Sequence, residues 1–162
     1  MRKDLAIGKQ GEDGFIKILK KGKLKASSNN DKNTRSHYDI KAELDGQEFT
    51  AEVKNDLYAA KSGNIAIEVF NPYSNKKSGL SITKSDLWVH IVDSQYWIAR
   101  TKELKSFVAK NTPFKKFDRA GDGNANILLY KVESIIPEVF HRIDNLTAKN
   151  IKGLISDLIL QG

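Results

Sequence analysis

The strongest pattern in the chain is an alternation of apolar and polar side chains on both sides of the Asp-Gly step at position 45. Apolar residues occupy every second position of the segments 38–44 and 49–53, and Asp-Gly is a favoured two-residue turn between antiparallel strands. We therefore expect a β-hairpin here. A two-residue turn pairs Leu44 with Gln47 and thereby fixes the register of every pair further from the turn.

Helical and strand patterns follow one another along the rest of the chain. Apolar residues recur at helical spacing in segments that predict helices over 5–20, from 101 to about 108, and over 151–159. Alternating or continuous apolar runs predict strands at 65–69, 88–92, 95–99 and 127–132. Turn-forming and charged residues predict loops at 21–36 and 71–79. This order predicts an α/β fold in which a mixed sheet begins in the hairpin and is flanked by helices.

The length and composition favour one globular unit. The chain is long enough to bury a core, and we expect a single domain over residues 1–162. It contains no cysteine, which excludes disulfides and thiolate metal sites. No stretch approaches the roughly 18 apolar residues that a membrane-spanning helix needs. We therefore expect a soluble, intracellular protein of the cytoplasm with no membrane partner.

Basic side chains are in excess, with 27 lysines and arginines against 20 aspartates and glutamates and a net charge of +7. This excess favours a polyanionic partner such as DNA. Two clusters in expected loops are the best candidates for phosphate contacts, and the first also offers a tyrosine that could stack on a base. The candidates are Tyr73, Asn75, Lys76 and Lys77 in the first loop and Lys115, Lys116 and Arg119 in the second. A solvated surface remains the alternative interpretation.

The hairpin register brings two acids together. It places Asp39 opposite Glu52, with both side chains on one face and their Cβ atoms roughly 4.5–5.5 Å apart. Because like charges at this distance repel, a counter-charge is expected. Lys54 lies on the same face, and Mg²⁺, or Mn²⁺ in its place, would compensate the acids better. The carbonyl of Val53 is a candidate further ligand, and the register places His37 opposite Lys54.

These residues resemble the signature of the PD-(D/E)xK nuclease superfamily. In that signature an acid on one strand is followed, on the next strand, by Glu or Asp, any residue and Lys. The match is Asp39 together with Glu52-Val53-Lys54, and Tyr38 stands where the name of the motif has proline.

A glutamate on the preceding helix adds to the resemblance. Glu12 precedes Phe15 and Ile16 by about one helical turn and therefore lies beside the apolar face. It is similar in place to the helix-borne glutamates of archaeal-type Holliday-junction resolvases and several related endonucleases. The resemblance covers about residues 5–70 and implies a restriction-endonuclease-like fold with the active site on the hairpin.

The resemblance also implies roles for these side chains. Asp39 and Glu52 would bind Mg²⁺, and Lys54 would position a water or stabilise charge on the phosphate in the transition state. Glu12 would bind a second metal or orient a water. Glu68, on the third expected strand, is a weaker candidate for a supporting acid, with an ordinary edge charge as the alternative.

The implied activity is Mg²⁺-dependent hydrolysis of phosphodiester bonds in DNA. The cut would be sequence-specific, as in restriction and homing enzymes, or structure-specific, as in Holliday-junction resolvases. Cleavage of both strands at a symmetric site would require a homodimer or a higher homo-oligomer.

Several alternatives stay open on the sequence alone. The acids and Lys54 could form ion pairs on an ordinary hairpin surface. The chain could be a non-catalytic nucleic-acid-binding module with the fold of a nuclease, although a binder of polyanions gains nothing from two carboxylates that face its ligand. The final helix could close the core or form a dimer surface. His90 and His141 show no metal-ligand spacing and are expected to be structural or exposed.

Overall fold

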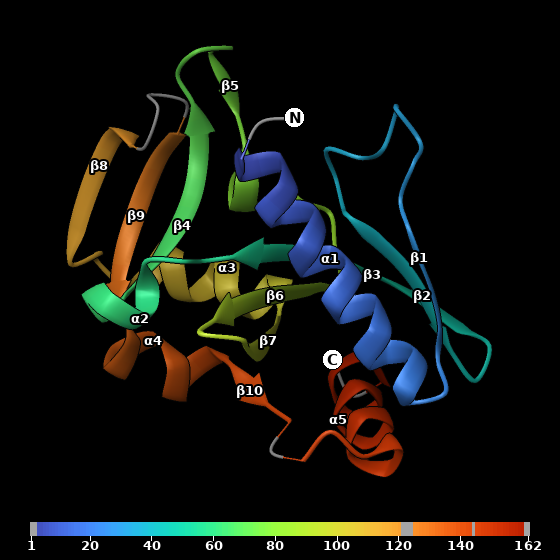
Figure 1. Cartoon of the computed structure of the whole chain (residues 1–162). Coiled ribbons are helices and arrows are strands. Elements are labelled where there is room, and N and C mark those ends of the chain that lie inside the picture. Colours follow the sequence, from blue (N-terminus) through green and yellow to red (C-terminus); the bar gives the residue numbers. More distant parts are fainter. Residues whose placement is uncertain (1–2, 121–124, 144, 161–162) are drawn as a thin grey trace.

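The computed structural model of the chain describes residues 3–120, 125–143 and 145–160, which form two β-sheets with helices around them (Figure 1). The first sheet has six strands, in the spatial order β1 (Lys25–Ser28), β2 (Ile40–Leu44), β3 (Gln47–Asn55), β6 (Leu87–Val92), β7 (Gln95–Arg100) and β10 (His141–Arg142). The second has four, in the order β5 (Lys76–Lys77), β4 (Asn64–Asn71), β9 (Ala125–Lys131) and β8 (Lys115–Ala120). The described helices are α1 (Lys3–Lys21), α2 (Ala59–Ser62), α3 (Thr101–Lys110), α4 (Val132–Val139) and α5 (Ala148–Leu160), with a 3₁₀ turn η1 (Gly79–Ser81).

The hairpin of β2 and β3 has the register that the sequence predicts. Its pairs run from Leu44 and Gln47 beside the turn to Ile40 and Ala51. Both residues of the Asp-Gly turn have positive φ angles, 48° and 85°, a conformation that aspartate tolerates and glycine adopts freely. The turn chemistry therefore sets which side chains of β3 share a face.

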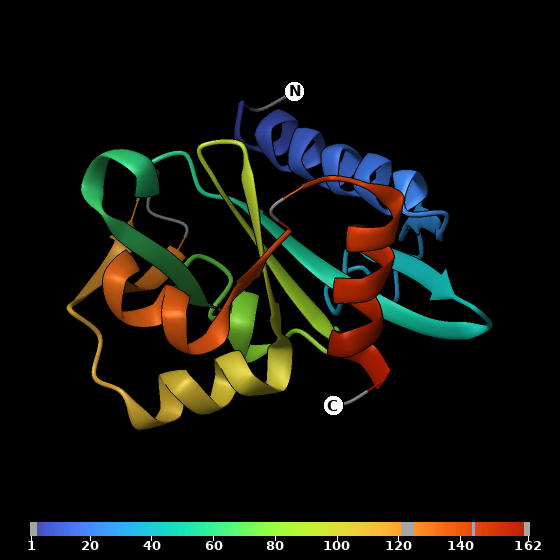
Figure 2. The same cartoon turned by 90° about the horizontal axis from the view of Figure 1, so that it is seen from below.

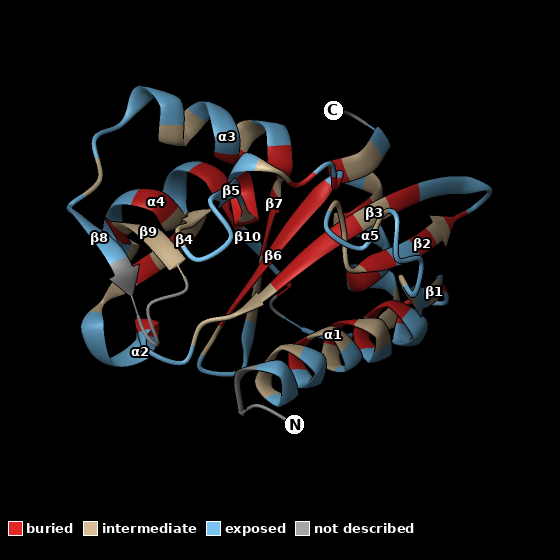
Figure 3. Ribbon diagram, turned by 90° about the horizontal axis from the view of Figure 1, so that it is seen from above, coloured by how far each residue is buried: buried red, intermediate tan, exposed pale blue. Residues whose placement is uncertain are grey.

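The central pair of strands in the first sheet, β3 and β6, is parallel. Glu52 lies opposite Trp88, and Lys54 lies opposite His90. Parallel neighbours need a long crossover connection, so the chain leaves the sheet after β3 and returns as β6. The crossover contains α2, β4, β5 and η1 and supplies two strands of the second sheet. Figure 3 shows buried residues along most of β6 and in the middle of β3.

Helices cover the first sheet on both faces. Helices α1 and α5 lie together on one half of the molecule, and α3 and α4 lie on the other (Figure 2). The first half contains a core cluster that includes Phe15 of α1 and Ile155 of α5. The second half contains a cluster in which Trp88 of β6 and Leu104 of α3 pack with Ile67 of β4. The structure thus confirms the predicted α/β fold with a mixed sheet flanked by helices.

Strand β4 lies where the sequence predicts a strand, but it belongs to the second sheet. It pairs with β9 in antiparallel orientation, and its Ile65 and Ile67 side chains are fully buried in the second core cluster. An alternating pattern predicts a strand without naming its partner. The second sheet is therefore a finding of the structure.

Three strands lie in segments where loops are expected, so these loop predictions are wrong in part. β1 alternates between exposed and half-buried residues, β5 consists of two exposed lysines, and β8 begins with Lys115 and Lys116. Polar edge strands lack the apolar alternation on which strand prediction depends.

Helix α5 closes the core. Ile151 and Ile155 are fully buried and pack in the cluster that contains α1, as expected for a helix that closes the core. None of the described helices is both long and apolar enough to cross a membrane.

We predict that Ile155→Ala destabilises the protein by about 2–5 kcal/mol, because it removes a fully buried side chain and leaves a cavity. Urea unfolding followed by circular dichroism measures the change. Leu160→Ala on the same helix is the control, since this side chain is 58% exposed and its truncation should change the stability by about 0.5 kcal/mol or less. Equal effects of the two substitutions would contradict the packing of α5 on the core.

Candidate active site

Asp39 lies where the chain enters β2, one residue before the regular ladder of pairs begins. Its amide donates to the carbonyl oxygen of Ala51 at 2.9 Å. Its carboxylate Oδ2 accepts a hydrogen bond from the amide of Val53, also at 2.9 Å. The side chain is therefore bound to the backbone of β3 beside Glu52, instead of facing Glu52 as one rung of the ladder.

The prediction that His37 lies opposite Lys54 is wrong. His37 belongs to a turn, in which its amide donates to the carbonyl oxygen of Thr34 at 2.8 Å. Its own carbonyl oxygen accepts the amide of Lys84 at 2.8 Å and the hydroxyl of Thr83 at 2.9 Å. These bonds tie the backbone of His37 to the segment before β6, so the strand begins only at position 40.

Glu52 and Lys54 form a half-enclosed ion pair on β3. The Nζ of Lys54 lies 3.5 Å from Oε1 of Glu52. Glu52 is 8% exposed, and its other oxygen, Oε2, is buried and has no hydrogen-bond partner among the described residues. A buried carboxylate oxygen without a donor is unfavourable, so this atom is where a ligand would gain most.

The pKa values of the two hairpin acids, Glu52 and Asp39, are both raised above their ordinary values. Burial is the largest cause that raises the pKa of Glu52, to about 7; the charge of Lys54 opposes it, and the charges of Asp39 and Glu12 add to it. Burial also raises the pKa of Asp39 against the lowering effect of the Val53 hydrogen bond. Both acids are therefore held where their charged forms are unfavourable without a further cation.

Glu12 brings a third carboxylate close to the pair from α1. Burial raises its pKa to about 7, and the charge of Asp39 is the next largest cause. The charge of Lys54 acts on Glu12 in the opposite direction. The structure therefore gathers Glu12, Asp39, Glu52 and Lys54 into one electrostatic cluster.

Glu68 approaches this cluster from the second sheet. Burial by itself lowers the pKa of Lys54, but the charges of Glu52, Glu68 and Asp39 outweigh burial and hold the pKa above its ordinary value. Lys54 is therefore charged throughout the physiological range, and three acids hold it in that form. The influence of Glu68 on Lys54 favours the interpretation of Glu68 as a supporting acid over that of an isolated edge charge.

The arrangement of the acids suits a metal ion that takes only a few of its ligands from the protein. In the described segments, no three His, Cys, Asp or Glu side chains come close enough to hold a metal ion between them. Mg²⁺ commonly takes one or two carboxylates and completes its shell with water and substrate oxygens, so Asp39 and Glu52 suffice. The unpartnered Oε2 of Glu52 is a carboxylate oxygen that could serve as such a ligand. For Val53, the structure shows its amide bound to Asp39, and its carbonyl as a metal ligand stays a prediction.

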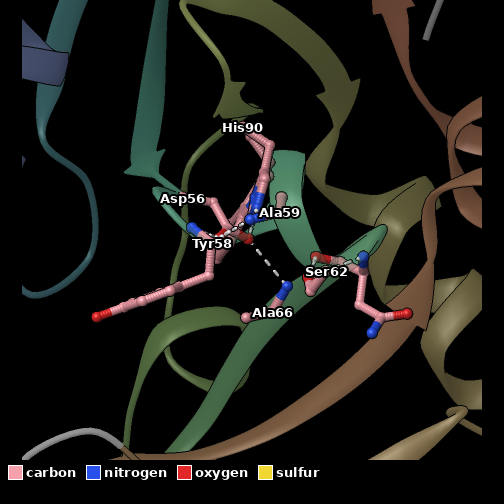
Figure 4. Close-up of polar contacts among 8 residues, drawn as sticks. Asp56, Tyr58, Ala59, Ser62, Ala66 and His90 are labelled. Atoms are coloured by element: carbon pink, nitrogen blue, oxygen red, sulfur yellow. Dashed lines mark hydrogen bonds and ion pairs between the residues drawn. The ribbon is translucent and has the colours of Figure 1, made fainter.

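Sequence reasoning missed Asp56 and the contact it makes with His90 (Figure 4). The Nε2 of His90 lies 2.9 Å from Oδ2 of Asp56, and His90 is fully buried, as expected for a structural histidine. One signal was available, because Asp56 follows Glu52 and Lys54 at the next alternate position, one residue after the end of β3.

The two lysine clusters predicted to contact DNA lie at opposite edges of the second sheet. Lys76 and Lys77 form β5, and Lys115 and Lys116 begin β8. All four are exposed, and they lie on strands, not in the predicted loops. Tyr73 and Asn75 lie in the turn before β5, where Tyr73 is 84% exposed. Arg119 falls within β8, and its side chain lies outside the described part of the chain.

A solved bacterial homing endonuclease, I-Ssp6803I, has a similar fold. The likeness covers 68% of this chain and 75% of that chain, with a TM-score of 0.52 and 16% sequence identity. The sequence matches no protein-family model and no curated protein. At this identity the likeness shows a shared fold alone.

We predict that Glu52→Gln stabilises the protein at pH 8 by on the order of 1–3 kcal/mol, because it removes a charge that burial disfavours. A carboxyl whose pKa is raised on folding stabilises the fold at low pH, and this contribution is lost as the pH rises through about 7. The variant should therefore lose less stability than the wild type between pH 5 and pH 8.

Urea unfolding at several pH values without divalent cations measures this difference. Glu48→Gln is the control, because Glu48 lies on the same strand and is exposed. An identical pH dependence in the wild type and Glu52→Gln would contradict the assigned state of Glu52.

Proposed function

We propose that this protein is a Mg²⁺-dependent DNA endonuclease whose active site consists of Asp39, Glu52, Lys54 and Glu12. The observation that carries the proposal is the buried Oε2 of Glu52, which has no hydrogen-bond partner among the described residues while Lys54 occupies Oε1. The fold shared with a homing endonuclease supports the choice of DNA as the substrate.

Each side chain has a distinct task in this proposal. Asp39 and Glu52 would hold Mg²⁺, or Mn²⁺ in its place, with the Val53 carbonyl as a further ligand. Such an ion would polarise the scissile phosphate and lower the pKa of a bound water. Asp39 presents one carboxylate oxygen while the amide of Val53 fixes the other. Lys54, held charged by its acidic neighbours, donates to the phosphate oxygens as negative charge grows on them.

Glu12 would act on the water side of the reaction. It reaches the cluster from α1, a different element from the two ligand acids, and it is half-buried. From there it orients the attacking water, whose oxygen bonds to phosphorus as the bond to the leaving deoxyribose oxygen breaks. Glu68 supports the charge of Lys54 from the second sheet.

The second sheet is the proposed contact surface for the DNA backbone. Its two edges carry Lys76 and Lys77 on one side and Lys115 and Lys116 on the other, which suits phosphate contacts. Tyr73, Asn75 and Arg119 would extend this surface. Cleavage of both strands at one site would need two active sites, so we propose a homodimer or a higher homo-oligomer, with sequence or structure specificity as in homing enzymes or junction resolvases.

Single substitutions in the cluster should abolish cleavage. We predict that Asp39→Asn, Glu52→Gln and Lys54→Met each lower the Mg²⁺-dependent rate by about 10²-fold or more, because each removes a metal ligand or a charge on the transition state. A panel of duplex, single-stranded and four-way-junction DNA, with Mg²⁺ or Mn²⁺, measures the rates.

Glu48→Gln is the matched control for this panel and should cleave like the wild type. Full activity in any of the three cluster variants would overturn the assignment. Wild-type protein that binds DNA and cleaves nothing on the panel would make the chain a non-catalytic nucleic-acid-binding module.

The lysine edges can be tested apart from cleavage. We predict that Lys76→Ala with Lys77→Ala weakens DNA binding and reduces the slope of log K against log salt by about 1–2, since each lost phosphate contact changes the slope by ~0.9. Fluorescence anisotropy in EDTA measures binding. Lys102→Ala with Lys110→Ala, on the exposed side of α3, is the control and should leave the slope unchanged.

A further inference from the structure

A chain of hydrogen bonds runs from Trp88 through His90 to Asp56, below the candidate active site. The Nε1 of Trp88 donates to Nδ1 of His90 at 3.2 Å. The Nε2 of His90 lies 2.9 Å from Oδ2 of Asp56. Trp88 and His90 are fully buried, so water does not compete for these bonds.

The chemistry of the three side chains fixes the direction of each bond. The indole N–H of Trp88 can only donate, so Nδ1 of His90 must accept. The neutral ring then carries its proton on Nε2 and donates it to the carboxylate of Asp56. Each group has one role in the chain, and a flip of the imidazole would place C–H groups against both partners and break both hydrogen bonds.

Asp56 anchors this chain to the crossover between β3 and β6 (Figure 4). Its Oδ2 also accepts the amide of Ala66 on β4 at 3.0 Å. Its Oδ1 accepts the amides of Tyr58 and Ala59 at the start of α2, at 3.3 and 3.1 Å. Asp56, the anchor of the chain, therefore joins both sheets and does not shift with the movement of a single side chain.

The other end of the chain lies under Lys54. In the parallel pair of β3 and β6, Trp88 is opposite Glu52 and His90 is opposite Lys54, so these side chains share one face of the sheet. The Nζ of Lys54 lies 5.9 Å from the centre of the Trp88 ring, within reach of a cation–π contact. Lys54 is thereby held between the carboxylate of Glu52 and the face of the indole.

We propose that Trp88 is a positioning residue for Lys54, and that His90 and Asp56 act through it by fixing the plane of the indole. The ammonium of Lys54 sits on a flexible stem, and one ion pair to Glu52 leaves its direction loosely defined. An indole ring whose plane is fixed by the hydrogen bonds through His90 to Asp56 restricts the Lys54 ammonium to one side of Glu52. From that side the ammonium meets the phosphate. The inference rests on the proposed function for the role of Lys54, while the packing beneath Lys54 can be tested without any cleavage.

Two substitutions at His90 separate positioning from simple anchoring. His90→Asn places a carbonyl oxygen near the position of Nδ1, so it keeps an acceptor for Trp88 and loses the bond to Asp56. His90→Gln places an amide near the position of Nε2, so it keeps a donor for Asp56 and leaves the indole N–H of Trp88 without an acceptor. The first variant preserves the orientation of the ring and the second preserves the anchor.

We expect kcat of His90→Gln to fall on the order of tenfold below that of His90→Asn, with KM within about twofold, because the loss lies in the geometry of the transition state. The ranking of stability should be the reverse, with His90→Asn the less stable variant because Asp56 loses a buried partner. Rates are measured at a temperature at which both variants are folded.

Leu104→Ala is the control for destabilisation alone. Leu104 is fully buried in the same core cluster as Trp88, and its truncation should lower stability while kcat of the folded enzyme stays that of the wild type. If kcat follows stability across all three variants, or is equal in the two His90 variants, the chain is an anchor only and the proposal is overturned.

Two readouts do not depend on cleavage. Hydrogen exchange of the Trp88 indole N–H, assigned with Trp97→Phe, should be fast in His90→Gln and slow in His90→Asn. The upfield ring-current shift of the Lys54 ε-methylene protons, assigned with Lys54→Arg, should shrink in His90→Gln alone.

These readouts separate the failure of this inference from the failure of the proposed function. If the wild type cleaves no DNA, the proposed function fails, but the shifts still test the positioning of Lys54. Unchanged shifts in His90→Gln overturn the positioning whatever the activity.

Discussion

The parallel pairing of β3 with β6 is the constraint on which the rest of the structure depends. It brings Glu52 and Lys54 beside Trp88 and His90, and the pairing requires the chain to leave the sheet and return. The connection that results is not a bare loop. It builds α2, β4, β5 and η1, and β4 carries Glu68 toward Lys54 from the second sheet. The candidate active site is thus formed where the two sheets meet.

The buried acids of the candidate site lower the stability of the fold. Burial raises the pKa values of Glu12 and Glu52 to about 7 and raises that of Asp39 as well, so three acids are held near one another where water would suit them better. Two hydrophobic clusters, one on each face of the first sheet, supply the stabilisation that offsets this arrangement. Such local conflict between charge and burial is typical of sites with a chemical task.

Local rules account for much of the fold and of the candidate site. The Asp-Gly turn fixes the register from Leu44 to Ile40, and this register placed the hairpin acids near each other from the sequence alone. The register failed at His37, because bonds to Thr83 and Lys84 end the strand early. Those partners lie far away in sequence, and no periodicity encodes them. The same holds for Asp56 and His90, which meet only because β3 and β6 pair.

The crossover also determines when the site is assembled as the chain folds. All four residues of the proposed active site lie before position 55, yet Trp88 and His90 lie after residues 56–86, whose ends must meet before β3 and β6 pair. Contacts that close so long a segment form slowly, after local hairpins and helices. A nascent chain that has only its N-terminal half therefore holds Asp39, Glu52 and Lys54 on a hairpin that does not yet pair with β6. The proposed active site is therefore completed late in folding, when the remaining strands have emerged. A truncated or unfinished chain carries the sequence motif without the strand β6 that packs beside it.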